Sequence, residues 1–250
     1  MEASSLISTG VFALLGLGLI FGLKHAMEVD HVVAVSTIVS EHRNLFRATL
    51  VGALWGLGHT VSLVIVGVLV LIFRVAIPPA LANWLEFGVA LMIIALGALA
   101  VWRVFRRRAD VHVHRHSHDG DSHVHIHFHE HGTEHNRVIP KATSHSHAIS
   151  QVGFKPLLVG AMHGLAGSAA LTLLILTKIQ SVSLGLIYLL LFGVGSTVGM
   201  LLMSGLIGLP FALSARRLTG FNSGLQTVAG VISIAFGFWY AYATGIKSLW

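Results

Sequence analysis

The chain has 250 residues, of which 54% are hydrophobic and only 10% charged, whereas soluble globular proteins carry about 25% charged residues. Its mean hydropathy is +0.80 and its formal net charge is +6. This composition excludes a disordered chain, a coiled coil and an ordinary cytosolic enzyme. The excess positive charge does not indicate nucleic-acid binding either, because the basic residues stand in short loops beside apolar segments.

Six apolar segments are long enough to cross a bilayer, which takes roughly 20 residues. They cover residues 6–40, 48–73, 84–105, 154–177, 182–208 and 226–246. The sequence therefore predicts an all-α integral membrane protein with six transmembrane helices. We expect three parts: a three-helix unit at 1–108, a His-rich loop without stable structure at 109–153, and a second three-helix unit at 154–250.

The loops after the first, third and fifth segments contain twelve of the sixteen Lys and Arg residues. The positive-inside rule places such loops in the cytoplasm. We therefore expect both termini outside, the His-rich loop inside, and a location in the bacterial cytoplasmic membrane.

Ionisable residues interrupt the first apolar segment. His25, Glu28, Asp30 and His31 follow one another closely, and each centred charge costs about 2.5–3.5 kcal/mol on insertion. One interpretation is an interfacial cluster in which Lys24 pairs with Glu28. The other is a site for a divalent cation, held by nitrogen and oxygen because the chain has no cysteine.

The spacing of these residues sets a condition on the metal site. On a straight helix, at about 100° per residue, Asp30 and His31 would point away from His25. All three can bind one ion only if the helix unwinds near residues 26–29. If the helix stays regular, His25 and Glu28 share a face and other segments complete the site.

The two halves of the chain resemble each other at an offset of 137–140 residues. Gly22-Leu-Lys-His25 matches Gly160-Ala-Met-His163, and the segment containing His59 matches the one containing Ser196. Chance similarity among Gly-rich apolar helices is the alternative. Because each half has three segments, a true repeat would be inverted, as in many transporters. This places His59 and His163 among the candidate ligands.

Twelve of the seventeen histidines lie between residues 112 and 147. Such tracts are typical of metal binding, and the alternation at 123–129 would set four imidazoles on one face of a strand. A pH-responsive linker is the alternative, and the match of residues 131–135 to a metalloprotease pattern is expected by chance in so His-rich a tract. We expect auxiliary metal ligands at His112, His114, His116, His118, His123, His125, His127, His129, His131, His135, His145 and His147.

The segment from Gly22 to His31 resembles the signature of the nickel/cobalt transporters, in which one membrane helix carries H-A-x-D-A-D-H. Leu57-Gly-His-Thr60 is similar to their second histidine motif, and His163-Gly-Leu-Ala-Gly-Ser168 to the six-span branch associated with urease nickel supply. Glu28 stands where the family has Asp, and the acidic-threonine motif of the larger members has no counterpart.

The resemblance implies that His25, Asp30, His31 and His59 handle the metal. It implies a permease that takes up Ni²⁺, or Co²⁺, by alternating access, without enzymatic activity and without a prosthetic group. Expected partners are the divalent ion, the lipid bilayer and cytoplasmic nickel chaperones or urease maturation proteins, with no nucleic acid.

Two other functions fit the same sequence. One is export of a metal or a small anion, with the His-rich loop as sensor, and the other is a membrane-anchored metal store. For a permease with imidazole ligands, protonation competes with the metal, so transport is expected to fall below about pH 6.5, the ordinary pKa of histidine.

Overall fold

The computed structural model describes residues 2–42, 44–74, 77–109, 111–118, 121–128, 152–165, 175–179, 181–214 and 219–246. The regular elements among these residues are helices and one pair of strands. In chain order the elements are α1 (Glu2–His25), α2 (Val29–Val39), α3 (Leu45–Phe73), α4 (Pro79–Ala109), β1 (Val111–His118), β2 (Asp121–Phe128), α6 (Lys155–Gly164), α8 (Val182–Ser214), α9 (Thr219–Ala241) and the short π-helix η2 (Tyr242–Ile246).

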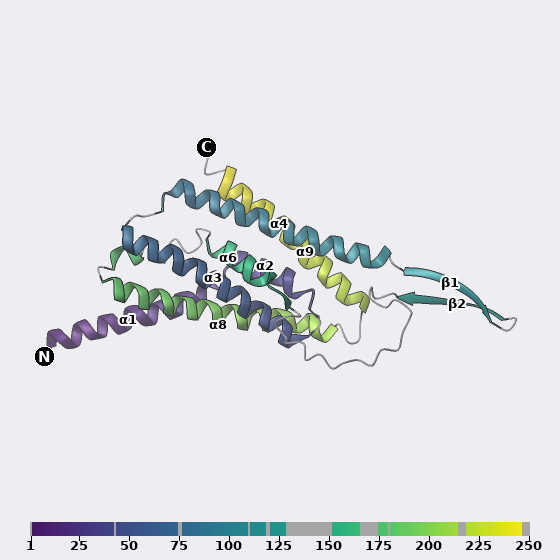
Figure 1. Ribbon diagram of the computed structural model, residues 1–250, viewed down its shortest axis with the longest axis horizontal. Helices are drawn as coiled ribbons and strands as arrows, with labels where there is room; N and C mark the ends of the chain where they lie inside the picture. The colour runs from purple at the N-terminus through teal and green to yellow at the C-terminus, as the bar shows by residue number, and fades with distance from the viewer. Residues whose placement is uncertain are drawn as a thin grey trace.

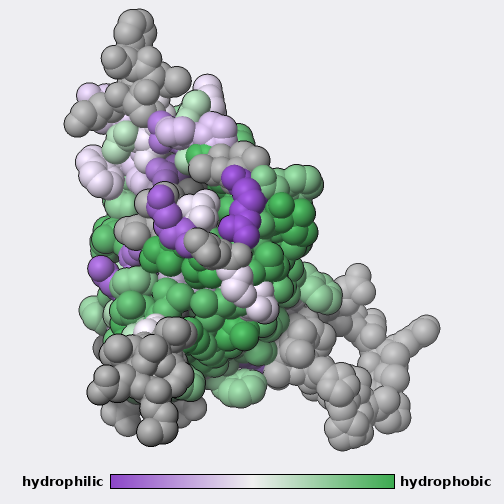
Figure 2. Space-filling model, turned by 90° about the vertical axis from the view of Figure 1, so that its left-hand side faces the viewer, coloured by the Kyte–Doolittle hydropathy of each residue, from purple (hydrophilic) through white to green (hydrophobic). Residues whose placement is uncertain are grey.

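Four helical stretches among the described residues are long and apolar enough to cross a membrane: Leu45–Phe73, Pro79–Arg106, Val182–Ser214 and Phe221–Gly245. A fifth is obtained if Gly10–His25 and Val29–Val39, which meet at 53°, form one broken span. Hydrophobic side chains cover much of the molecular face in Figure 2. The predicted helical membrane protein is thereby confirmed in outline. The predicted span at 154–177 begins with α6, but residues 166–174 lie outside the described residues, so the count of six stays a prediction.

The long helices form two groups in Figure 1, with the shortest helices between them. Helices α4 and α9 pack side by side as one group, and α1, α3 and α8 form the other. Helix α2 contacts α4, α8 and α9, while α6 packs against α3. Helix α2 is therefore largely buried in the bundle, whereas α6 buries one face, which includes His163, and exposes Leu158 and Met162 on the other.

Glycines bring the helices of the second group into backbone contact. A methyl group on Gly22 of α1 would collide with the carbonyl oxygen of Phe192 in α8, and one on Gly160 of α6 would collide with that of Trp55 in α3. Such close approach is typical of small residues at membrane helix interfaces. The two contacts are related by the sequence offset noted above, since Gly160 corresponds to Gly22 and Phe192 to Trp55.

The end of α2 is tied to the α4–α9 pair by polar contacts. Glu41, just beyond α2, forms an ion pair with Arg103 of α4. Gln226 of α9 donates a hydrogen bond of 2.8 Å to the carbonyl oxygen of Ser40. These contacts hold α2 against the neighbouring helices at the end away from the break with α1.

Within the predicted loop, strands β1 and β2 form an antiparallel hairpin. The register places His112 opposite His127, His114 opposite His125 and His116 opposite His123. Strand β2 covers most of residues 123–129, where the alternating histidines predict a strand with four imidazoles on one face. Residues 129–151 lie outside the described residues, and the metal-binding role of the loop stays a prediction.

Candidate metal centre

A break in the backbone separates α1 from α2 at the polar residues. The amide of Ala26 still donates to the carbonyl of Gly22, at 3.2 Å, but the amide of Glu28 donates three residues back to His25, at 3.0 Å. Helical bonding resumes when Val32 donates to the carbonyl of Glu28, at 3.0 Å. The helix is therefore unwound near residues 26–28, where a break is needed if His25, Asp30 and His31 are to bind one ion. The break turns His25 and His31 toward each other.

Four histidines and one aspartate meet at this break from four helices. Their exposed fractions are 3% for His25, 7% for Asp30, 0% for His31, 1% for His59 and 0% for His163. His25 and Asp30 flank the break, His59 comes from the middle of α3, and His163 from the last turn of α6. The structure thus brings together the ligands expected from three separate apolar segments.

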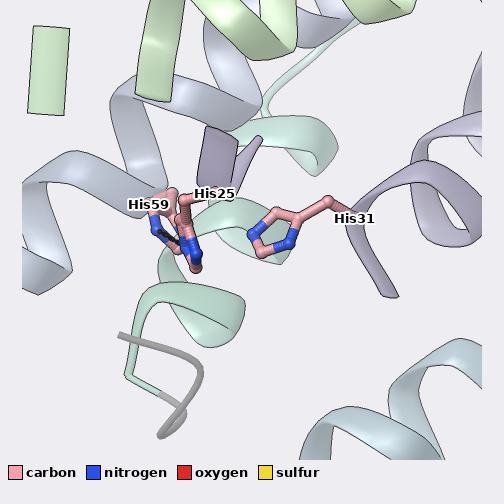
Figure 3. Close-up of side chains that lie close together, drawn as sticks. All are labelled: His25, His31 and His59. Carbon is pink, nitrogen blue, oxygen red and sulfur yellow. Dashed lines mark hydrogen bonds between the residues drawn. The ribbon is translucent and has the colours of Figure 1, made fainter. Parts of the chain in front are cut away.

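One set of potential ligands consists of imidazoles alone. His25, His31 and His59 offer nitrogen atoms that lie within 4.8 Å of one another. The Nε2 atoms of His25 and His59 are 3.1 Å apart and share one hydrogen bond. Figure 3 shows the imidazole of His31 pointing toward this pair.

The second set contains a carboxylate. Asp30, His31 and His163 also offer ligand atoms within 4.8 Å of one another. One carboxylate oxygen of Asp30 is 3.1 Å from Nδ1 of His31, and the other is 2.9 Å from Nε2 of His163. His31 belongs to both sets.

In each set, one pair of ligand atoms has the spacing that a borderline divalent cation requires. Two ligands at about 2.1 Å from one ion lie about 3.0 Å apart at a right angle and about 3.4 Å apart in a tetrahedron. The separations of 2.9–3.1 Å between His25 and His59 and between Asp30 and His163 match these values. Imidazole with carboxylate is a donor set suited to nickel, cobalt or zinc.

Several buried nitrogens of the cluster lack a hydrogen-bond partner among the described residues. They are Nε2 of His31, Nδ1 of His59 and Nδ1 of His163. An unsatisfied buried polar atom is costly, so three of them in one cluster call for a ligand or ordered water.

Glu28 contacts the cluster through His25. Its carboxylate is 3.1 Å from Nδ1 of His25, on the side of the ring away from His59, and the Glu28 side chain is 43% exposed. It belongs to neither ligand set. This arrangement matches the carboxylates that orient a ligating histidine, and the role of Glu28 as a ligand itself stays a prediction.

Apart from Glu28, the residues that surround the approach to Asp30 were not among the predicted site residues. A cavity of about 420 Å³ is lined by Glu28, Val29, Asp30, Phe236, Trp239 and Tyr240. Glu86 of α4 hydrogen-bonds Tyr240 and lies close enough to Asp30 and Glu28 to interact with their charges. A lone carboxylate in an apolar segment was the available signal for Glu86, since such residues are usually functional.

Some predicted site residues have no described side chain. His129, His131, His135, His145 and His147 lie outside the described residues. For the histidines from 112 to 127 the structure gives the strand register alone.

Comparison with known proteins agrees with the chemistry of this centre. Residues 11–242 match the model of the NicO family, described as high-affinity nickel-transport protein. The chain is 38% identical over 236 residues to the urease accessory protein UreH of Bacillus sp. (strain TB-90), covering 94% of this chain and 93% of that one. It is 24% identical over 223 residues to the Arabidopsis thaliana chloroplast protein FOR GROWTH AND FERTILITY 1, covering 88% of this chain and 56% of that one.

No solved structure matches the chain. The family match covers nearly the whole sequence, and the bacterial relative is aligned over almost its full length. The chain therefore belongs to the NicO family of nickel transporters, which are membrane proteins and not enzymes.

Proposed function

We propose that this protein carries Ni²⁺ into the cell through a site formed by His25, Asp30, His31, His59 and His163. The observation that carries the proposal is the burial of four imidazoles and one carboxylate around a helix break, in the middle of an apolar bundle. Burying these groups is costly unless they bind something, and the donor set suits nickel. Co²⁺ has the same preferences and is the expected second substrate.

The proposed architecture is a pair of inverted three-span repeats. Reciprocal contacts support it: Gly58 packs against the carbonyl of Leu157, and the corresponding Gly195 packs against that of Leu19. In such folds substrate binds near the midplane at broken helices, where the halves meet. The two halves then rock around the bound ion to expose it to either side.

The proposed orientation has six spans, both termini outside and the His-rich loop in the cytoplasm. It follows from the distribution of Lys and Arg residues. The loop would receive imported nickel and hold it for cytoplasmic nickel chaperones or urease maturation proteins. The name of the bacterial relative supports this link with urease.

Uptake measurements test the transport site. We expect cells producing the wild-type protein to accumulate ⁶³Ni²⁺, and ⁵⁷Co²⁺ less strongly, while His25→Ala, Asp30→Ala and His59→Ala lose most of this uptake. His42→Ala is the matched control, because His42 is a half-buried histidine between α2 and α3, outside the cluster. Wild-type uptake in the three variants, at equal protein levels, would end the assignment of the site.

A deletion tests the loop separately. Removing residues 112–147 leaves the transport site intact, so we expect nickel uptake to continue while the metal content of the purified protein falls. Loss of all nickel handling on deletion would instead identify a store.

A further inference from the structure

The two ligand sets cannot both be filled, because they share His31. Its ring centroid lies 4.5 Å from that of His25, 5.2 Å from that of His59 and 4.1 Å from that of His163. A neutral imidazole has one nitrogen with a free electron pair, so it binds one metal ion at a time. The cluster therefore has two overlapping positions for a single ion.

The two positions differ in charge. The set of His25, His31 and His59 is neutral, whereas the set of Asp30, His31 and His163 carries the carboxylate. A divalent cation is attracted more strongly to the second set, particularly in a bundle interior of low dielectric constant. The neutral set holds the ion less tightly and is the better position from which to release it.

The positions also differ in access. The cavity of about 420 Å³ reaches Asp30 of the carboxylate set, while none of the three histidines of the neutral set lines it. His25 and His59 face each other beside Phe192 of α8. An ion that arrives through the cavity meets the carboxylate set first.

The two sets also differ in the helices that supply their ligands. The neutral set comes from α1, α2 and α3, all in the first half of the chain. The carboxylate set joins α2 to His163 of α6, in the second half. A movement of α6 away from α2 would break up the carboxylate set and leave the neutral set whole.

We propose that one Ni²⁺ ion occupies these positions in succession, with His31 as the ligand common to both. The ion enters at Asp30, His31 and His163. It then exchanges Asp30 and His163 for His25 and His59 while it stays bound to His31. This handover rests on the proposed transport function. It adds to that function the order in which the residues of the cluster bind the ion.

Nickel binding to the purified protein tests the handover. We would use the full chain with the twelve loop histidines replaced by Gln, so that the loop contributes no imidazole. Titration calorimetry with Ni²⁺ is expected to give one ion per chain. His163→Ala removes the tighter carboxylate set and should bind one ion with an affinity at least about 10-fold weaker. His59→Ala removes only the weaker neutral set, so it should still bind one ion with nearly unchanged affinity. His31→Ala removes both sets and should bind none.

Nickel K-edge X-ray absorption on the protein with all five cluster residues intact reports how many imidazoles surround the ion. This measurement does not require that any variant of the cluster folds. At most three imidazoles are expected around the ion, because the two sets are used in turn. Four imidazoles around one ion, two ions per chain, or complete loss of binding in both His59→Ala and His163→Ala would each overturn the handover. Absence of nickel binding in the protein with an intact cluster would instead contradict the proposed function itself.

Discussion

Thr60 and Thr197 form a hydrogen bond through their hydroxyl groups, 3.0 Å apart, although 137 residues separate them in the chain. Thr60 donates its own proton to the carbonyl of Gly193, also at 3.0 Å, so Thr197 is the donor in the pair. The two threonines occupy corresponding positions of the two halves. A residue that meets its own counterpart lies next to a two-fold axis, which is where an inverted pair of repeats would place it.

This pair makes a testable prediction about stability. Thr60→Val and Thr197→Val should each lower the free energy of unfolding by about 1 kcal/mol, which corresponds to about 2–4 °C in the melting temperature of the detergent-purified protein. Thr60→Val also breaks the bond to the Gly193 carbonyl, so the double variant should lose little more than Thr60→Val alone. Thr49→Val is the control, since its hydroxyl bonds the carbonyl of Leu45 within α3. Fully additive losses would contradict the coupling.

The close approach of the helices at Gly22 and Gly160 predicts matching effects of substitution in the two halves. Alanine at either position meets a backbone carbonyl that cannot move aside, so we expect a loss of about 1–3 kcal/mol and reduced nickel uptake. Gly88→Ala is the matched control, because nothing lies within 4 Å of an added methyl group there. The measurements are thermal unfolding and ⁶³Ni²⁺ uptake at equal protein levels. Tolerance of alanine at Gly22 or Gly160 would show that the helices are not in backbone contact.

Glu28 is expected to tune the centre without being a ligand. Glu28→Gln replaces the negative carboxylate beside Nδ1 of His25 with a neutral amide. The amide orients the imidazole of His25 less firmly. Because His25 belongs to the neutral set alone, we expect the nickel affinity of that set, measured in a His163→Ala background, to fall by about 10- to 100-fold, as for other groups that orient a ligating histidine. Calorimetry with Ni²⁺ measures this, with Glu41→Gln as the control, since Glu41 pairs with Arg103 outside the cluster. Complete loss of binding in Glu28→Gln would make Glu28 a direct ligand instead.

Glu86 is expected to act on the approach of the ion. Its charge lies near Asp30 and Glu28, beside the cavity, and negative charge at such an opening raises the local concentration of cations. Glu86→Gln should therefore raise the nickel concentration for half-maximal uptake, on the order of 10-fold, and leave the maximal rate nearly unchanged. Tyr240→Phe keeps the carboxylate and should have a smaller effect. An unchanged half-maximal concentration in Glu86→Gln would remove Glu86 from the route.

Much of the fold could be predicted because its signals are local. The apolar segments that became α3, α4, α8 and α9 are visible in the hydropathy of the chain alone. The break between α1 and α2 is different, since residues 26–28 include neither Gly nor Pro. The sequence showed only that three ligands would require a break. The contact that accompanies it, between Asp30 and His163, joins residues 133 positions apart and had no local signal.

The candidate centre was predicted in its members but not in its arrangement. His25, His31 and His59 could be named because imidazoles in apolar helices are rare and costly. That they divide into two sets sharing His31 depends on the packing of α6 against α3. Glu86 was missed as a neighbour of the site because its partner Tyr240 lies on another helix, at the far end of the chain.

The ends of the helices at the break add a further electrical effect. Helix α1 ends at His25 and α6 ends at Gly164, so the carbonyl ends of two helices lie next to the same cluster. Each such end carries about half a negative elementary charge. The N-terminal end of α2 also lies at the break and carries about half a positive charge, which the carboxylate of Asp30 in its first turn offsets. The backbone alone therefore favours a positive guest over a negative one, which argues against a small anion as the substrate.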